Sequence, residues 1–489
     1  MTDKVDTPDD IQALAKGGRT NVLGFLLRLI ARIPFLFIAG RIYGADALGR
    51  VAYAMLVVEF AAQVASMGLR RGLALQLAHE GANPAHEAWD GLLLATLVAA
   101  PITALLMMFP QAMFPNSPIN GLELVMPLAA LGIALTDIML SALAYRFDVG
   151  ATVRTRAIVE PWAISIGAFA FSYFSLRDGL LFAYGLSIAA GLVTAFWPFL
   201  KSYGLPRGWR PSPRRLIALG RQNLPLAAAD ATEWGSRRID LAILGLFASP
   251  ATVGIYYVAQ QVASLPQKLK SSFDPILGPV IARNLEAGNK VAVAKQISQV
   301  GFWIIAAQAG VALALGIPGE GVMGLVGPNF VDGNGALAFL LLAEVAAAAA
   351  VVSEAALIYI ARHRNFLISG AMLGVQAILT VAFILGFKSQ GYGELYQAAG
   401  PAIALTLALG LGSLIKTRLA ARLLGASVSV WRWPLITAVG AATLVGWIAT
   451  KGPEWSELIF GIPAILATYG WVIWKRGFGE EDRALFRKS

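Results

Sequence analysis

The sequence predicts an all-α integral membrane protein with about fourteen transmembrane helices. Of its 489 residues, 57% are hydrophobic and only 14% are charged, which is more apolar surface than a water-soluble chain of this size needs. Apolar runs of about 20 residues recur along the chain, and a helix of that length crosses the roughly 30 Å hydrocarbon core of a bilayer. The predicted spans are residues 21–43, 47–69, 91–110, 121–144, 157–176, 179–200, 223–247, 250–267, 297–317, 336–360, 366–386, 396–415, 433–450 and 457–474.

The Lys and Arg residues predict the orientation of these spans. Fourteen spans place both termini on one side, and most of the 39 basic residues fall in segments on that side. Cytoplasmic segments carry such an excess, so both termini are predicted to be cytoplasmic. The net charge of +10 thus reflects basic cytoplasmic segments, which set the topology and attract anionic lipid headgroups. No nucleic-acid partner is expected. The first apolar run is too long and too charged for a cleaved signal peptide, so we expect it to be retained.

An internal repeat divides the predicted helices into two lobes. With a shift of 205 residues, GADALGRVAYA (44–54) aligns with SPATVGIYYVA (249–259), and LAHEGANPAHEAW aligns with NLEAGNKVAVAKQ after a one-residue gap. Each copy holds six helices in one orientation, an organisation typical of transporters with a site where the copies meet. The predicted domains are a cytoplasmic tail (1–20), an N-terminal lobe (21–222), a C-terminal lobe (223–432), two further helices (433–474) and a second cytoplasmic tail (475–489).

The span at 223–247 contains an unusual number of charges. Asp230, Glu233, Arg237 and Asp240 follow steps of three and four residues, so a helix places them on one stripe, and Arg238 lies beside it. Charges inside a span normally face the interior of a bundle or a watery cavity. A surface amphipathic helix is the alternative interpretation.

The first predicted span adds two more arginines. Asn21, Arg28 and Arg32 share one helical face, and no acidic residue of the same span neutralises either arginine. The functional interpretation is a pair of cations facing an anion in a cavity. The structural interpretation is a salt bridge to another helix, for example from Arg32 to Glu59.

Acidic residues also occur inside the spans and raise the question of ion coupling. The acids expected to bind a coupling proton or sodium ion are Glu59, Asp230, Glu233, Asp240, Glu344 and Glu354. Such acids are also compatible with a cation-coupled multidrug exporter. No residue spacing indicates a metal site and no glycine-rich phosphate loop is present, so no cofactor is expected beyond a possible coupling H⁺ or Na⁺.

Four regions of the chain are informative: GRIYGADALGRVAYA with the following GLRRG, ATVGIYYVAQQ, FDPILGPVIARNLEAG and GVMGLVGPNF. They resemble stretches of the bacterial polysaccharide or O-antigen flippases, the polysaccharide branch of the multidrug/oligosaccharidyl-lipid/polysaccharide exporter superfamily. The resemblance implies two six-helix lobes in a V shape, two additional C-terminal helices, and a location in the bacterial inner membrane. It also implies alternating access that moves an undecaprenyl-diphosphate-linked oligosaccharide from the cytoplasmic to the periplasmic leaflet.

The resemblance further implies which residues and partners serve transport. Arginines line the cleft in this family, and Arg28, Arg32, Arg237 and Arg238 are the residues here that suit this role, with Asn21 beside them. An arginine fork binds diphosphate oxygens bidentately. A polymerase and an export machinery are the expected protein partners. A membrane polysaccharide polymerase is a weaker alternative, because the longest predicted outer connection (318–335) holds no histidine and no clustered carboxylates.

Overall fold

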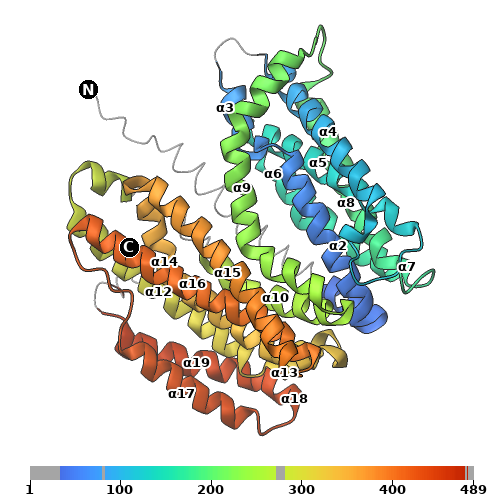
Figure 1. Ribbon diagram of the computed structural model, residues 1–489. Coiled ribbons are helices and arrows are strands. Elements are labelled where there is room, and N and C mark those ends of the chain that lie inside the picture. Colours follow the sequence, from blue (N-terminus) through green and yellow to red (C-terminus); the bar gives the residue numbers. More distant parts are fainter. Residues whose placement is uncertain (1–32, 80–82, 271–280, 480–481, 483–489) are drawn as a thin grey trace. The chain divides into compact units, whose positions relative to one another are not determined.

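The computed structural model describes residues 33–79, 83–270, 281–479 and 482, and every secondary-structure element within them is a helix (Figure 1). By length and apolarity, nine helical segments among these residues can cross a membrane. The chain is therefore a multi-pass, all-helical integral membrane protein, as predicted. Helices also lie in each predicted range that the structure describes, including those too charged or too short to count among the nine. The total of fourteen spans stays a prediction.

The chain forms two compact units, Met1–Arg238 and Ile239–Ser489. In the first unit, α3, α4, α5 and α8 enclose an apolar core that includes Leu73, Ile138 and Phe199. Its elements are η1 (Ala39–Tyr43), α2 (Gly44–Ala65), α3 (Leu69–Leu77), α4 (Pro84–Met108), η2 (Pro110–Ala112), η3 (Leu122–Val125), α5 (Leu128–Tyr145), α6 (Val149–Thr152), η4 (Val153–Val159), α7 (Glu160–Phe171) and α8 (Gly179–Tyr203). The division between the units falls inside α9 (Pro213–Phe247).

In the second unit, α14 and α16 pack along one another, α15 covers α16, and α17 and α19 pack on α12 (Figure 1). Phe302, Val352 and Tyr469 lie in its apolar core. Its elements after α9 are α10 (Pro250–Lys270), α12 (Lys290–Gly316), α13 (Gly319–Val326), η5 (Pro328–Gly333), α14 (Asn334–Ile360), α15 (Arg362–Ser389), α16 (Glu394–Leu424), α17 (Pro434–Ala449), α18 (Glu454–Ser456), η6 (Glu457–Gly461), α19 (Ile462–Val472) and η7 (Ile473–Gly477).

The helix boundaries support the predicted repeat. Three pairs of helices begin 206 residues apart, namely α2 and α10 (Gly44, Pro250), α4 and α12 (Pro84, Lys290), and α5 and α14 (Leu128, Asn334). An asparagine caps α4 and α12 at matching positions, because the side chain of Asn83 accepts from the amide of Ala85 and that of Asn289 accepts from the amide of Ala292. Such caps satisfy backbone donors that a helix start leaves unpaired. The same local solution at both positions agrees with a common origin of the two halves.

One predicted helix start is wrong. The helix of the span predicted to begin at residue 223 begins at Pro213, so about half of the connection between the predicted spans 179–200 and 223–247 is helical. Polar and basic residues marked this stretch as a connection, although a helix that continues past the hydrocarbon core carries such residues in the headgroup region.

A buried ion network joins α2 to the connections before α5 and α8. Arg50 contacts Glu123 at 2.7 Å and Asp178 at 3.6 Å, and Arg177 contacts Glu123 at 3.2 Å. The side chain of Glu123 is fully buried, and it also accepts from the backbone amides of Asn120 and Gly121. Two arginines and two acids compensate one another here, so the network serves as a scaffold.

A second buried acid fastens the C-terminal tail to α12 and α17. Asp482 accepts hydrogen bonds from Arg432, the backbone amide of Gly479, Gln299 and Trp303. Burial of its carboxyl group opposes ionisation, but these donors outweigh it and lower the pKa of Asp482 to about 2. The tail contact is therefore ionic throughout the physiological pH range.

We expect reporter fusions to test the topology. Fusions at Asn116, Asn329 and Lys451 should report the outside, and fusions at Pro211 and Ser489 should report the inside, because the basic segments stay in the cytoplasm. Paired alkaline phosphatase and fluorescent protein fusions at each position measure this. Equal signals from Pro211 and Asn329 would contradict both the topology and the repeat.

Candidate functional site

The charged segment of α9 forms an ion-pair cluster with two other helices of the first unit. Arg71 of α3 contacts Asp230 through Nε at 3.0 Å and Glu233 through a terminal nitrogen at 2.7 Å. Glu233 also pairs with Arg237, one helical turn later, at 4.0 Å. The predicted neighbours on α9 are therefore brought together, and Arg71 is the additional partner.

Glu59 of α2 belongs to the same region through Arg238. The two side chains approach to 3.5 Å, and each is about one quarter exposed. One turn away, the rings of Phe60 and Trp234 lie with their centroids 5.1 Å apart. An ion pair and an aromatic contact thus hold α2 against α9. Arg32, which we considered as a partner of Glu59, lies outside the described residues.

The position of Arg71 depends on two glycines. Gly68 follows α2 in the left-handed conformation, with φ +71°, and a Cβ atom there would lie 2.6 Å from the backbone nitrogen of Ala227. A Cβ atom at Gly72 would lie 1.7 Å from the amide oxygen of Asn223. Only glycine permits so close an approach, so α3 contacts α9 directly and Arg71 reaches Asp230.

Exposure within the cluster differs sharply between neighbouring acids. The side chain of Asp230 is completely buried, whereas those of Arg71 and Glu233 are 46% and 53% exposed. Neither carboxylate oxygen of Asp230 has a hydrogen-bond partner among the described residues. Asp230 therefore depends on the charge of Arg71, with a further contribution from Arg70.

The charges of the cluster are almost balanced. Four cations (Arg70, Arg71, Arg237 and Arg238) face three acids (Glu59, Asp230 and Glu233). The guanidinium groups can donate to a phosphate, but those of Arg71, Arg237 and Arg238 are already paired with carboxylates. An anion that binds here must compete with those carboxylates.

A neighbouring triad involves a further buried arginine. Arg156 of η4 pairs with Asp137 of α5 and, at 2.8 Å, with Glu160 of α7. This triad was not identified from the sequence, although the spacing of four residues between Arg156 and Glu160 is an available signal.

The predicted acids of the second unit have different partners. Asp240 is completely buried and accepts hydrogen bonds from Tyr256 at 2.6 Å and from Gln260 at 3.2 Å. Glu354 pairs with Lys416 at 3.1 Å, and Glu344 lies half-buried on α14. Their predicted role in ion coupling stays a prediction. The same holds for Asn21, Arg28 and Arg32, which lie outside the described residues.

Apolar spans, a two-part helical fold and charges within the spans are together typical of membrane transport proteins. The chain belongs to the family of polysaccharide biosynthesis proteins, whose pattern matches residues 38–314. No curated protein sequence matches significantly.

Solved structures of one superfamily share the fold. A lipid II flippase MurJ in an inward closed conformation superposes with a TM-score of 0.68 at 12% identity, covering 95% of this chain and 100% of that one. An inward-facing multidrug resistance MATE family transporter of the MOP superfamily gives 0.64 at 15% identity, with 82% and 96% covered. A MOP superfamily transporter from Pyrococcus furiosus, described as having a binding pocket of reverse polarity, gives 0.54 at 16% identity, with 84% and 95% covered. At these identities the likeness establishes the fold.

We expect the Arg71–Asp230 pair to show strong coupling in a double-mutant cycle. Arg71→Gln leaves a buried carboxylate without its main counter-ion and should cost about 1–3 kcal/mol of unfolding free energy, reduced from the fully buried case because Arg71 is half exposed. Arg71→Gln combined with Asp230→Asn should recover most of that loss. Reversible unfolding of the purified protein measures all three variants.

The control for this cycle is the pair of Arg154 and Asp148, which is about half exposed on both sides. Arg154→Gln should change the unfolding free energy by less than about 0.5 kcal/mol. If the double variant at Arg71 and Asp230 is as unstable as the sum of the single ones, the pair is not coupled.

Proposed function

We propose that the protein is a flippase for an undecaprenyl-diphosphate-linked oligosaccharide. It moves this lipid from the cytoplasmic to the periplasmic leaflet of the bacterial inner membrane by alternating access. The observation that carries the proposal is the family match over residues 38–314, together with the partly exposed Arg237 and Arg238 inside a predicted span. A polymerase that extends the glycan and an export machinery are the protein partners that this role requires.

The chemistry of the substrate suits the cluster on α2, α3 and α9. The diphosphate is anionic, the glycan needs water and the polyprenyl tail can stay in lipid. An arginine fork donates two parallel hydrogen bonds to phosphate oxygens and keeps its charge at any physiological pH. Arg237 and Arg238 supply such forks, and Arg28 and Arg32 are proposed to supply two more, with Asn21 nearby. The fold similarity to the lipid II flippase MurJ supports this assignment.

A second candidate function is a cation-coupled exporter of small molecules. It is favoured by Glu233 and Glu59, because exposed carboxylates within a span can attract a cationic substrate. The fold similarity to multidrug transporters supports it as well. An excess of arginines over acids in the cluster favours the anionic lipid. A membrane polysaccharide polymerase remains a weaker alternative, and nothing in the family match or the fold indicates an enzyme.

We predict that the geometry of the arginines matters as well as their charge. Lysine at Arg28, Arg32, Arg237 or Arg238 should leave transport impaired but measurable, whereas alanine should nearly abolish it. Losing a charge-assisted hydrogen bond costs on the order of 1.5–3 kcal/mol, roughly ten- to a hundredfold in affinity. The measurement is surface polysaccharide at matched membrane protein levels, together with the lipid-linked oligosaccharide that accumulates in the cytoplasmic leaflet.

Arg154→Ala is the matched control and should transport normally, because its ion pair is exposed and lies outside the cluster. Drug efflux by the wild type without accumulation of the lipid-linked intermediate in a deletion strain would overturn the flippase in favour of the exporter. Alanine variants at the four arginines that transport like the control would remove them from the substrate site.

We further propose that transport is coupled to a proton or sodium ion through Glu59, Asp230, Glu233, Asp240, Glu344 and Glu354. When a substrate diphosphate occupies the arginines of the cluster, Glu59 and Glu233 lose their counter-ions and need another cation. The bound substrate and the coupling ion are then thermodynamically linked.

In proteoliposomes, flipping should accordingly depend on an imposed ion gradient. Glu59→Gln and Glu233→Gln should weaken this dependence, whereas Glu286→Gln, an exposed acid outside the spans, should not. Full activity of the wild type with all gradients collapsed would refute coupling and leave the flippase proposal intact.

A further inference from the structure

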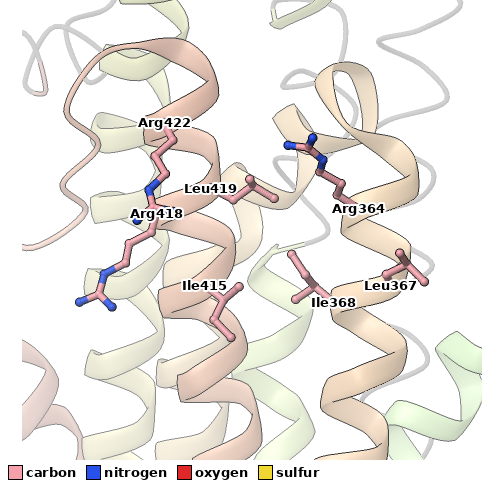
Figure 2. A pocket seen from close by; sticks show the side chains of 7 residues that line it. All are labelled: Arg364, Leu367, Ile368, Ile415, Arg418, Leu419 and Arg422. Carbon is pink, nitrogen blue, oxygen red and sulfur yellow. The ribbon is translucent and has the colours of Figure 1, made fainter.

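A pocket of about 450 Å³ lies between α15 and α16 in the second unit. Arg364 on α15 and Arg418 and Arg422 on α16 line it, together with aliphatic side chains that include Ile368, Ile415 and Leu419. Figure 2 shows Ile368, Ile415 and Leu419 pointing into the space between the two helices, and the guanidinium group of Arg364 pointing toward that space. The pocket thus has an apolar floor and a cationic rim.

Helical spacing explains this arrangement. Residues 415, 418, 419 and 422 recur at steps of three and four, so they share one face of α16, and residues 364 and 368 do the same on α15. In both helices the arginines lie nearest the end of the helix, in the first turn of α15 and the last two turns of α16. The rim therefore lies at the helix termini and the floor lies deeper in the bundle.

The three arginines differ from most buried or interfacial arginines of the chain. Arg50, Arg71 and Arg156 each pair with acids, whereas the side chains of Arg364, Arg418 and Arg422 make no hydrogen bond or ion pair to any described residue. All three are exposed. Three uncompensated positive charges around one pocket attract an anion.

The depth of the pocket indicates which anion. α16 has 31 residues and is about 46 Å long at 1.5 Å per residue, so it extends beyond the roughly 30 Å hydrocarbon core. The predicted topology places the ends of α15 and α16 that carry the arginines on the cytoplasmic side. The arginine rim then lies at the level of lipid phosphates, and the aliphatic floor lies at the level of acyl chains.

We propose that this pocket binds one anionic glycerophospholipid of the cytoplasmic leaflet. Arg364 binds its phosphate from α15, and the upper part of an acyl chain covers Ile368, Ile415 and Leu419. Figure 2 shows the guanidinium group of Arg418 pointing away from the space between the helices, so the flexible side chains on α16 turn toward the headgroup when the lipid binds. Basic pockets between spans on the cytoplasmic side bind anionic headgroups in this way. α15 is also the least buried of the candidate spans, with 17% of its most apolar window buried, so lipid reaches the pocket from the side.

Free phosphate fits the pocket less well, because it has no apolar group that could cover the aliphatic floor. The lipid-linked substrate carries a diphosphate too, but its proposed ligands belong to the other unit. The inference is therefore independent of the proposed function. A bound bilayer phospholipid would tie α15 to α16 at their cytoplasmic ends.

Native mass spectrometry of the full-length protein tests the proposal with four probes: phosphatidylglycerol, phosphatidylethanolamine, inorganic phosphate and undecaprenyl diphosphate. The wild type should bind one phosphatidylglycerol at least tenfold more tightly than phosphatidylethanolamine, and phosphate should not compete at millimolar concentration. The triple variant Arg364→Gln, Arg418→Gln and Arg422→Gln should lose at least tenfold in phosphatidylglycerol affinity. Leu419→Gln should lose severalfold, because the acyl contact is weakened.

The matched control removes the same charge elsewhere on the predicted cytoplasmic side. Arg210→Gln, Arg214→Gln and Arg221→Gln replace three exposed arginines that do not line this pocket and should leave the affinity unchanged. An equal loss of affinity in both triple glutamine variants would mean that the lipid responds only to general charge attraction, and this would overturn the site.

Tighter binding of undecaprenyl diphosphate than of phosphatidylglycerol, if the triple glutamine variant of the pocket loses it, would reassign the pocket to the substrate. The triple variant Arg364→Lys, Arg418→Lys and Arg422→Lys keeps the three positive charges, so it should stay folded and retain part of the phosphatidylglycerol affinity. Complete loss of that affinity in the folded variant would contradict binding through these charges.

Discussion

In the first unit of this protein, a buried carboxylate needs a counter-charge on another segment of the chain. Removing an ion from water costs several kcal/mol, and only a close partner with good geometry offsets that cost. Arg50 with Glu123, Arg71 with Asp230, and Arg156 with Asp137 all satisfy this requirement within the first unit. Each pair joins segments far apart in the sequence. The ion pairs therefore fix which helices lie side by side. Apolar contacts specify the neighbours of a helix less well, because lipid offers every apolar helix face the same chemistry.

The ion pairs depend in turn on close approach of the backbone. Gly68 and Gly72 allow α3 to lie directly on α9, and the backbone nitrogen of Ala227 occupies the space that a side chain at Gly68 would take. A larger residue would push α3 away, and Arg71 could then no longer reach the buried carboxylate of Asp230. The motif GLRRG thus has a mechanical explanation: the two glycines set the distance between the helices, and the second arginine between them neutralises the acid.

The sequence allowed the helical fold to be predicted, because bilayer thickness sets the length of an apolar run. It also identified Asp230, Glu233, Arg237 and Arg238 as an unusual set within one span. It did not identify Arg71, which lies outside the predicted spans, because its contact with Asp230 depends on a left-handed turn at Gly68 and on tertiary packing. The start of α9 at Pro213 was missed for a related reason, since a helix that leaves the hydrocarbon core has the composition of a loop.

The two units have helix starts at corresponding positions, but their buried acids have different kinds of partner. This difference indicates which acids and arginines an anionic substrate can reach. In the second unit the carboxylate of Asp240 is completely buried and accepts hydrogen bonds from the neutral side chains of Tyr256 and Gln260, so it is shielded from solvent. In the cluster on α2, α3 and α9 of the first unit, the acids are met by arginines that remain about one quarter to one half exposed. An anion can approach those arginines only by displacing carboxylates, and a displaced carboxylate needs a new cation. The binding of an anionic substrate and the binding of a cation at such a cluster are then linked. The linkage follows from the nearly equal numbers of cations and acids in the cluster.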